Sequence, residues 1–144
     1  MVHLEEITPD NWRSGLQVAK EQQRYVASSA GLLARAYVYR GQRSQARLIL
    51  NGDTPVGMAL WYDLPDMDAY DFSQIFIDDR YQRRGYGLAA ARLVLEEMRR
   101  DGRFPGVYLC YIDGNDAARR LYEQLGFART GEDDGDELVM YRKM

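Results

Sequence analysis

The sequence predicts a single mixed α/β domain, in which about seven strands form one sheet covered by about four helices. Two observations lead to this fold class. Short apolar runs typical of strands alternate with segments whose apolar residues recur every three or four positions, as in amphipathic helices. A chain of 144 residues can also bury roughly 70% of its extended surface around one core. We therefore expect one domain over residues 1–144.

Turn and cap residues mark the ends of the elements. Thr8-Pro9 supplies an N-cap followed by a proline at the first helical position, which predicts a helix that begins there. Asn51-Gly52, between two apolar runs, is the strongest short-range signal for a β-hairpin. The expected strands are residues 2–7, 45–50, 54–62, 72–77, 107–112, 128–131 and 137–142. The expected helices are residues 8–20, 22–40, a segment that begins near 85, and 115–125.

Composition excludes several classes of protein. A formal net charge of −3 predicts no affinity for nucleic acid or for an anionic membrane. The absence of a signal peptide and of an 18-residue apolar run makes a soluble cytoplasmic protein the default expectation. Cys110, the single cysteine, lies in an apolar run and is expected to be buried. His3 is the lone histidine and has no nearby ligand partners, so no metal site is expected.

A glycine-rich segment follows the strand-like run Ile75-Phe76-Ile77 after a short polar loop. Gly85 and Gly87 allow turn conformations and a close approach of the backbone to a bulky anion. Leu88 then opens an amphipathic helix, whose first N–H groups and dipole favour a phosphate. Cationic side chains lie at the rim of this anion site. The whole segment reads Gln82-Arg83-Arg84-Gly85-Tyr86-Gly87-Leu88.

A nicotinamide dinucleotide is the competing ligand for this segment, because Gly85-x-Gly87-x-x-Ala90 fits the Rossmann fingerprint. Three features count against it. A polar loop separates the glycines from their strand, and no acidic residue stands about 20 positions later to bind the ribose. The motif also begins past mid-chain, which leaves too little sequence for a doubly wound sheet. A purely structural glycine turn is the other alternative.

A second motif begins 28 residues after Gly87. Asn115 can cap a short amphipathic helix, and Tyr122 lies on the inward side of that helix. In a chain with 11 tyrosines, Tyr122 could be an ordinary core residue. A phenol beside a reacting group could instead donate a proton.

Together the two motifs resemble those of the GNAT superfamily of acetyl-CoA-dependent N-acetyltransferases. The pattern is Gln/Arg-x-x-Gly-x-Gly/Ala, then Asn-x-x-Ala-x-x-x-Tyr-x-x-x-Gly-Phe, and the chain meets it at Gln82–Gly87 and from Asn115 to Phe127. The resemblance implies a GNAT fold, with a mostly antiparallel sheet and splayed central strands. It also implies acetyl-CoA as co-substrate, a role for Tyr122 as acid toward the departing thiolate, and no metal. The residues implied in cofactor binding are Ile75, Phe76, Ile77, Gln82, Arg83, Arg84, Gly85, Tyr86, Gly87, Leu88, Asn115 and Tyr122.

The acceptor is expected to be a small amine. Residues 61–79 hold six aspartates and no Lys, although these could be simple solvated loop acids. The sequence is similar to bacterial spermine/spermidine (diamine) acetyltransferases, which implies a polyamine acceptor and a homodimer. The candidate acceptor residues are Tyr25, Asp66, Asp71 and Ser73, with Asp71 also the candidate base for direct attack by a neutral amine. Two alternatives remain open: another amine (a protein N-terminus, an amino acid or an aminoglycoside), or a non-catalytic acetyl-CoA sensor.

Overall fold

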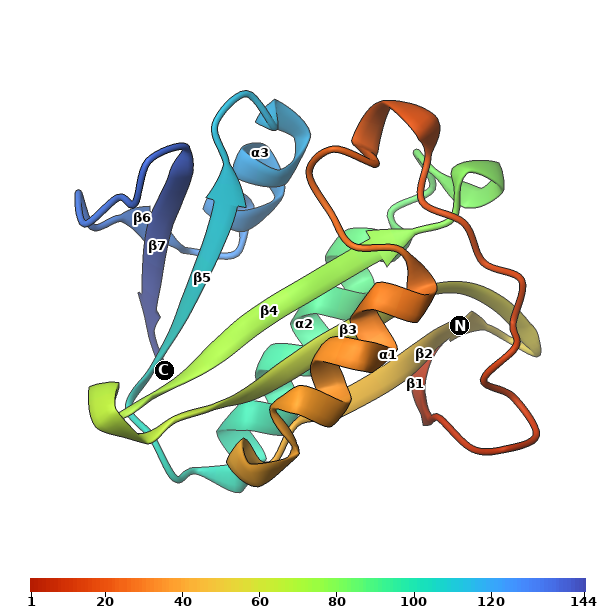
Figure 1. The fold of residues 1–144 in the computed structure, drawn as a ribbon, viewed down its shortest axis with the longest axis horizontal. Helices are drawn as coiled ribbons and strands as arrows, with labels where there is room; N and C mark the ends of the chain where they lie inside the picture. Colours follow the sequence, from red (N-terminus) through yellow and green to blue (C-terminus); the bar gives the residue numbers. More distant parts are fainter.

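One sheet of seven strands, in the order β1-β2-β3-β4-β5-β7-β6, forms the centre of the molecule (Figure 1). A computed structural model describes all residues, 1–144. The β4–β5 pair is parallel and every other pair is antiparallel, so the expected mixed, mostly antiparallel sheet is confirmed. The strands are β1 (Val2–Glu6), β2 (Gln45–Asn51), β3 (Thr54–Leu64), β4 (Ala69–Ile77), β5 (Gly106–Ile112), β6 (Ala128–Arg129) and β7 (Glu137–Lys143).

Three α-helices cover the sheet from two sides (Figure 1). Helix α1 (Ser29–Val38) lies over β3 on one face, and α2 (Tyr86–Asp101) crosses the opposite face. Helix α3 (Asp116–Gln124) packs behind β5, on the same face as α2. None of the three has both the length and the hydropathy needed to span a bilayer.

The helix expected at residues 8–20 does not form, so the structure has three α-helices where the sequence predicted four. The amides of Asn11 and Trp12 both donate to the Thr8 carbonyl, but the turn stops there. Gly15 then adopts a left-handed φ of 72°. Leu16, Val18 and Ala19 are buried in a stretch that forms no helix.

The second helix is shorter than expected, because it begins at Ser29 and not near Gln22. The Ser28 hydroxyl accepts a hydrogen bond from the Gly31 amide and so caps the helix. Leu32 is the fully buried side chain of α1. Residues Lys20–Gln22 form only a 3₁₀ turn.

Strands β4 and β5 diverge soon after they meet, which confirms the expected splay (Figure 1). They pair only at Tyr70–Val107 and at Asp71–Tyr108. Immediately afterwards β4 contains a bulge, because Trp61 pairs with Phe72 while Leu60 pairs with Gln74. Ser73 is thus the extra residue, and from this point one edge of β4 has no strand beside it.

Candidate active site

A cleft of about 650 Å³ lies where β4 and β5 separate. The start of α2 borders one part of it and the start of α3 another, while residues 18–26 of the N-terminal segment form a further wall. Of the candidate residues, the cleft lining includes Tyr25, Ser73, Ile75, Phe76, Ile77, Gln82, Arg83, Gly85, Tyr86, Gly87, Leu88, Asn115 and Tyr122. Arg84, Asp66 and Asp71 are outside that lining.

The start of α2 presents free backbone donors to the cleft. Gly85 is the N-cap residue, with a left-handed φ of 81° and no side-chain cap. The Ala89 amide bonds to the Gly85 carbonyl, so the preceding amides of the first turn have no intrahelical acceptor. A Cβ added at Gly87 would meet only the Ile77 side chain, at 3.7 Å, so the space beside Gly87 is open. This arrangement suits a phosphate group.

Arg83 also has a left-handed backbone, with a φ of 63°. A non-glycine residue pays a steric penalty of about 1 kcal/mol in that region. The turn therefore requires a left-handed backbone at this position, although arginine is not a residue type that favours this conformation. Arg84 does not line the cleft itself, but its guanidinium lies 5.9 Å from the centre of the ring of Tyr81, which does.

The unpaired edge of β4 continues the cleft. Ile77 and Phe76 pair with Gly57 and Met58 of β3, which leaves their other edge facing the gap toward β5. Gly57 is essential to this pairing, because a Cβ there would lie 2.2 Å from the Phe76 carbonyl oxygen. The side-chain amide of Gln82 donates a hydrogen bond to the Ile77 carbonyl at 3.1 Å and holds the glycine-rich loop against the end of the strand.

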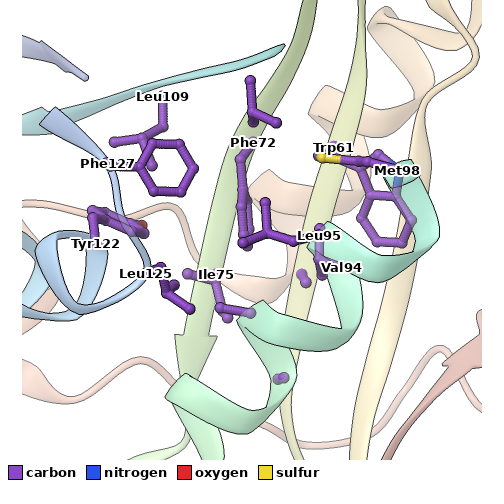
Figure 2. Close-up of a cluster of buried hydrophobic side chains, with 14 of the residues drawn as sticks. Trp61, Phe72, Ile75, Val94, Leu95, Met98, Leu109, Tyr122, Leu125 and Phe127 are labelled. Carbon is purple, nitrogen blue, oxygen red and sulfur yellow. The ribbon is translucent and has the colours of Figure 1, made fainter. Parts of the chain in front are cut away.

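Tyr122 projects from α3 toward the β4 side of the gap (Figure 2). The Asn115 side chain accepts from the Ala118 amide at 3.3 Å and fixes the start of the helix. The Tyr122 ring is 7% exposed, with edge contacts to Phe72 and Phe127. Burial alone raises the pKa of the Tyr122 phenol, so it is protonated at neutral pH and can donate that proton.

Asp71 lies on β4 just below the cleft, two residues before the cleft-lining Ser73. Desolvation raises the pKa of Asp71 to about 6, while the Tyr62 hydroxyl and Arg35 act to lower that pKa and Glu137 acts to raise it. The carboxylate can therefore accept a proton near neutral pH. Ser73 accepts a hydrogen bond from Arg35 at 3.3 Å, a contact that no pattern in the amino-acid sequence predicts.

Cys110 was expected to be buried, and this expectation is wrong: its side chain is exposed on the cleft wall. The neighbouring Val107, Leu109 and Tyr111 are buried, so strand alternation alone could have placed Cys110 on the open face. The pKa of its thiol is raised to about 11, first by partial burial and then by four surrounding carboxylates. These carboxylates belong to Asp71, Glu137, Asp134 and Asp133.

The aspartates of residues 61–79 do not act together. Asp63 is buried and receives two hydrogen bonds from Arg43. Asp78 is buried and pairs with Arg80. Asp66 lies in the 3₁₀ turn Pro65–Met67, at the opposite end of β4 from the start of α2, so the geometry gives no support to its candidate role. Only Asp71 of this group contributes to the acidic region around Cys110.

No group of three or more His, Cys, Asp or Glu side chains is arranged to hold a metal ion. The chemistry available comes from free backbone donors and a neutral phenol in the cleft and from a carboxylate of raised pKa, Asp71, just below it. Such a set can bind an elongated anion, orient a carbonyl and move protons.

Comparisons with known proteins agree with this geometry. Residues 5–127 match the model of the acetyltransferase (GNAT) family. The spermine/spermidine N(1)-acetyltransferase of Bacillus subtilis is 27% identical over 155 aligned positions, which cover 99% of both chains.

Two solved structures show the same fold. Spermidine N-acetyltransferase from Vibrio cholerae, in complex with CoA and spermine, superposes with a TM-score of 0.78 at 17% identity, covering 99% of this chain and 95% of that one. An aminoglycoside acetyltransferase in complex with coenzyme A gives a TM-score of 0.80 at 16% identity, with the same coverage. The family model spans most of the sequence and includes the whole cleft lining, from Val18 to Tyr122. The chain therefore belongs to the acetyltransferase (GNAT) family and is an N-acetyltransferase.

Proposed function

We propose that this enzyme transfers the acetyl group of acetyl-CoA to a primary amine of a polyamine or diamine, by direct attack of the neutral amine in a ternary complex. The observation that carries the choice of acceptor is the acidic region near Cys110 at the edge of the cleft, to which Asp71, Glu137 and Asp134 contribute, while Asp133 is already paired with Arg129. A substrate with two ammonium groups keeps one charged while the other reacts, and the remaining charge needs an anionic partner. The full-length similarity to a spermine/spermidine acetyltransferase supports the same choice.

The donor side of the cleft fits coenzyme A. The free amides at the start of α2 would bind the pyrophosphate, and Arg83 lies at their rim. The open edge of β4 at Ile75–Ile77 would pair with the amide groups of the pantetheine arm. A fixed N–H on that edge would polarise the acetyl carbonyl before charge develops on its oxygen. Acetyl-CoA supplies the activated thioester.

Two side chains would move protons. Tyr122 would protonate the departing thiolate, since its phenol is neutral, buried and free of competing partners. An aliphatic ammonium has a pKa of about 10.4 and must lose a proton before attack. Asp71 would accept that proton, directly or through water, because its pKa of about 6 lies close to neutrality.

Thiol release from acetyl-CoA with matched acceptors tests the proposal. Spermidine, spermine and putrescine should give higher kcat/KM than butylamine, which has the length of putrescine and one charge fewer. KM for spermidine should rise with ionic strength, because exposed charges are screened over about 8 Å at physiological salt. Asp71→Asn should lower kcat/KM for spermidine by at least tenfold.

Asp66→Asn is the matched control for that substitution, because it also removes one carboxylate but from the turn before β4, where the carboxylate does not act on Cys110. Its kinetics should remain those of the wild type. If the polyamines release no thiol while an aminoglycoside or a peptide amine does, the acceptor proposal fails and the assignment as an N-acetyltransferase stands.

A further inference from the structure

Arg35 places a cation beside the proposed acceptor end of the cleft. The guanidinium extends from α1, and its Nη1 donates a hydrogen bond to the Ser73 hydroxyl at 3.3 Å. Ser73 is the bulged residue of β4 and lines the cleft, so the contact lies at the cleft edge. Helix α1 carries no acidic residue, and Arg35 therefore has no partner for an ion pair along its own helix.

The groups that face Asp71 come from several elements, and Arg35 is the cation among them. Tyr62 of β3, Arg35 of α1 and Glu137 of β7 all act on the Asp71 carboxylate, and Asp71 in turn acts on Cys110 of β5. Arg35 favours the ionised form of Asp71, whereas Glu137 and burial oppose it. The guanidinium thus offsets part of the negative charge that gathers at this end of the cleft.

We propose that Arg35, held by its hydrogen bond to Ser73, is an internal counterion at the edge of the cleft and competes there with the charged ammonium groups of the acceptor. This inference rests on the proposed function. An incoming diamine must displace or repel the guanidinium, so Arg35 weakens the binding of doubly charged acceptors. It also keeps Asp71 ionised before the acceptor arrives.

Arg35→Gln tests this role, since glutamine keeps an amide donor for Ser73 and removes the charge. KM for spermidine should fall about two- to fivefold, the usual range for a partly exposed charge interaction, while KM for butylamine changes less. The acid limb of the pH–rate profile should move to higher pH, because a carboxylate that loses a neighbouring cation is harder to ionise. Arg35→Lys should restore both the wild-type KM and the wild-type pH profile.

Arg40→Gln is the matched control. It removes the same charge just beyond α1, where Arg40 contacts the exposed ring and the carbonyl of Tyr37. Its KM and pH profile should equal those of the wild type. Equal effects of the two substitutions, or a rise in KM for Arg35→Gln, would overturn the counterion role.

A second measurement does not depend on the acceptor. Cys110 is the single cysteine and is exposed on the cleft wall, so methanethiosulfonate reagents can probe the local charge. The ratio of modification rates for a trimethylammonium-ethyl reagent and an uncharged methyl reagent should rise at least twofold in Arg35→Gln and not in Arg40→Gln. An unchanged ratio overturns the inference. A raised ratio without any turnover of polyamines supports Arg35 as the counterion of Asp71 and overturns the acceptor assignment instead.

Discussion

The surroundings of Tyr122 suit it both for packing in the core and for the proton transfer proposed above. Its ring packs between Phe72 and Phe127 in the larger apolar cluster, an ordinary position for a core tyrosine (Figure 2). The side chain also borders the gap between β4 and β5, and no charged group acts on its hydroxyl. A neutral phenol with no internal partner is available to a substrate.

Tyr122→Phe separates these two roles, because it keeps the packing ring and removes the proton. We expect kcat to fall about 10²-fold, the usual contribution of a general acid, with little change in the affinity for acetyl-CoA or in thermal stability. Steady-state kinetics, calorimetry and thermal unfolding check the three expectations. Tyr108→Phe, on β5 outside the cleft lining, serves as the control. Wild-type turnover in Tyr122→Phe would show that Tyr122 has only a packing role.

Single positions were predictable where local chemistry decides them. The need for glycine at residue 85 follows from its left-handed backbone, and Asn115 caps a helix as its side chain suggests. The exposure of Cys110 was not anticipated, because the apolar run around it masks the alternation of the strand. The position of Arg35 depends on how α1 packs across the sheet, and no spacing in the sequence reveals a contact between residues 35 and 73.

At the scale of elements, helix α2 packs on the sheet along one face, and its first residues line the cleft. Ala90, Ala91, Val94, Leu95 and Met98 are buried on one side of it, and this apolar face holds the helix on the sheet. Its first turn is only partly buried against the core and opens onto the cleft. Changes at the start of the helix can therefore alter ligand binding while the fold is preserved.

Gly87→Val tests this separation. The Cβ meets only Ile77 at 3.7 Å, and valine has a better helix propensity than glycine, so the variant should fold without loss of stability. The added side chain would occupy space next to the free amides. The affinity for acetyl-CoA should fall at least tenfold, equivalent to about 1.4 kcal/mol, in a calorimetric titration. Unchanged affinity in a folded variant would exclude the start of α2 as the pyrophosphate site.

Elements with strong periodicity or turn signals were predicted within a few residues. The hairpin at Asn51-Gly52 and helix α2 are examples. The helix at residues 8–20 was wrong because Thr8-Pro9 is a valid start signal with no amphipathic segment behind it. Leu16 and Val18 are buried by the sheet, and long-range packing of this kind overrides a local cap.

At the scale of the whole molecule, the N-terminal segment closes one side of the cleft. Its residues Val18, Glu21, Tyr25 and others line the cleft, although they form no α-helix. The side chains of Gln74, on β4, and Asp78, just after β4, hold this segment through hydrogen bonds. Gln74 accepts a hydrogen bond from the Ala27 amide at 3.3 Å, and Asp78 accepts one from the Gln17 amide at 2.9 Å. The cleft thus depends on contacts between segments about 50 to 60 residues apart.

Of these two contacts, the one made by Asp78 is the stronger, because its buried carboxylate also accepts hydrogen bonds from the backbone and the guanidinium of Arg80. These bonds, that of the Arg80 side chain foremost, lower the pKa of Asp78 to about 2. A carboxyl group whose pKa is lower in the folded state stabilises the fold above its unfolded value of about 3.9, and this stabilisation is lost as the pH falls through the folded value. The difference of nearly two pKa units corresponds to about 2 kcal/mol at neutral pH.

Asp78→Asn should therefore lower the free energy of unfolding by about 2 kcal/mol at pH 7, as measured by urea denaturation. The difference from the wild type should shrink between pH 4 and pH 2, where the wild-type carboxylate becomes protonated. Because Gln17 loses a charged acceptor, the segment that carries Tyr25 should loosen, which raises KM for the acceptor more than KM for acetyl-CoA. Asp79→Asn, which removes the neighbouring exposed carboxylate, should change neither quantity. A stability difference that persists unchanged at pH 2 would show that Asp78 stabilises the fold through packing and uncharged hydrogen bonds and not through its charge.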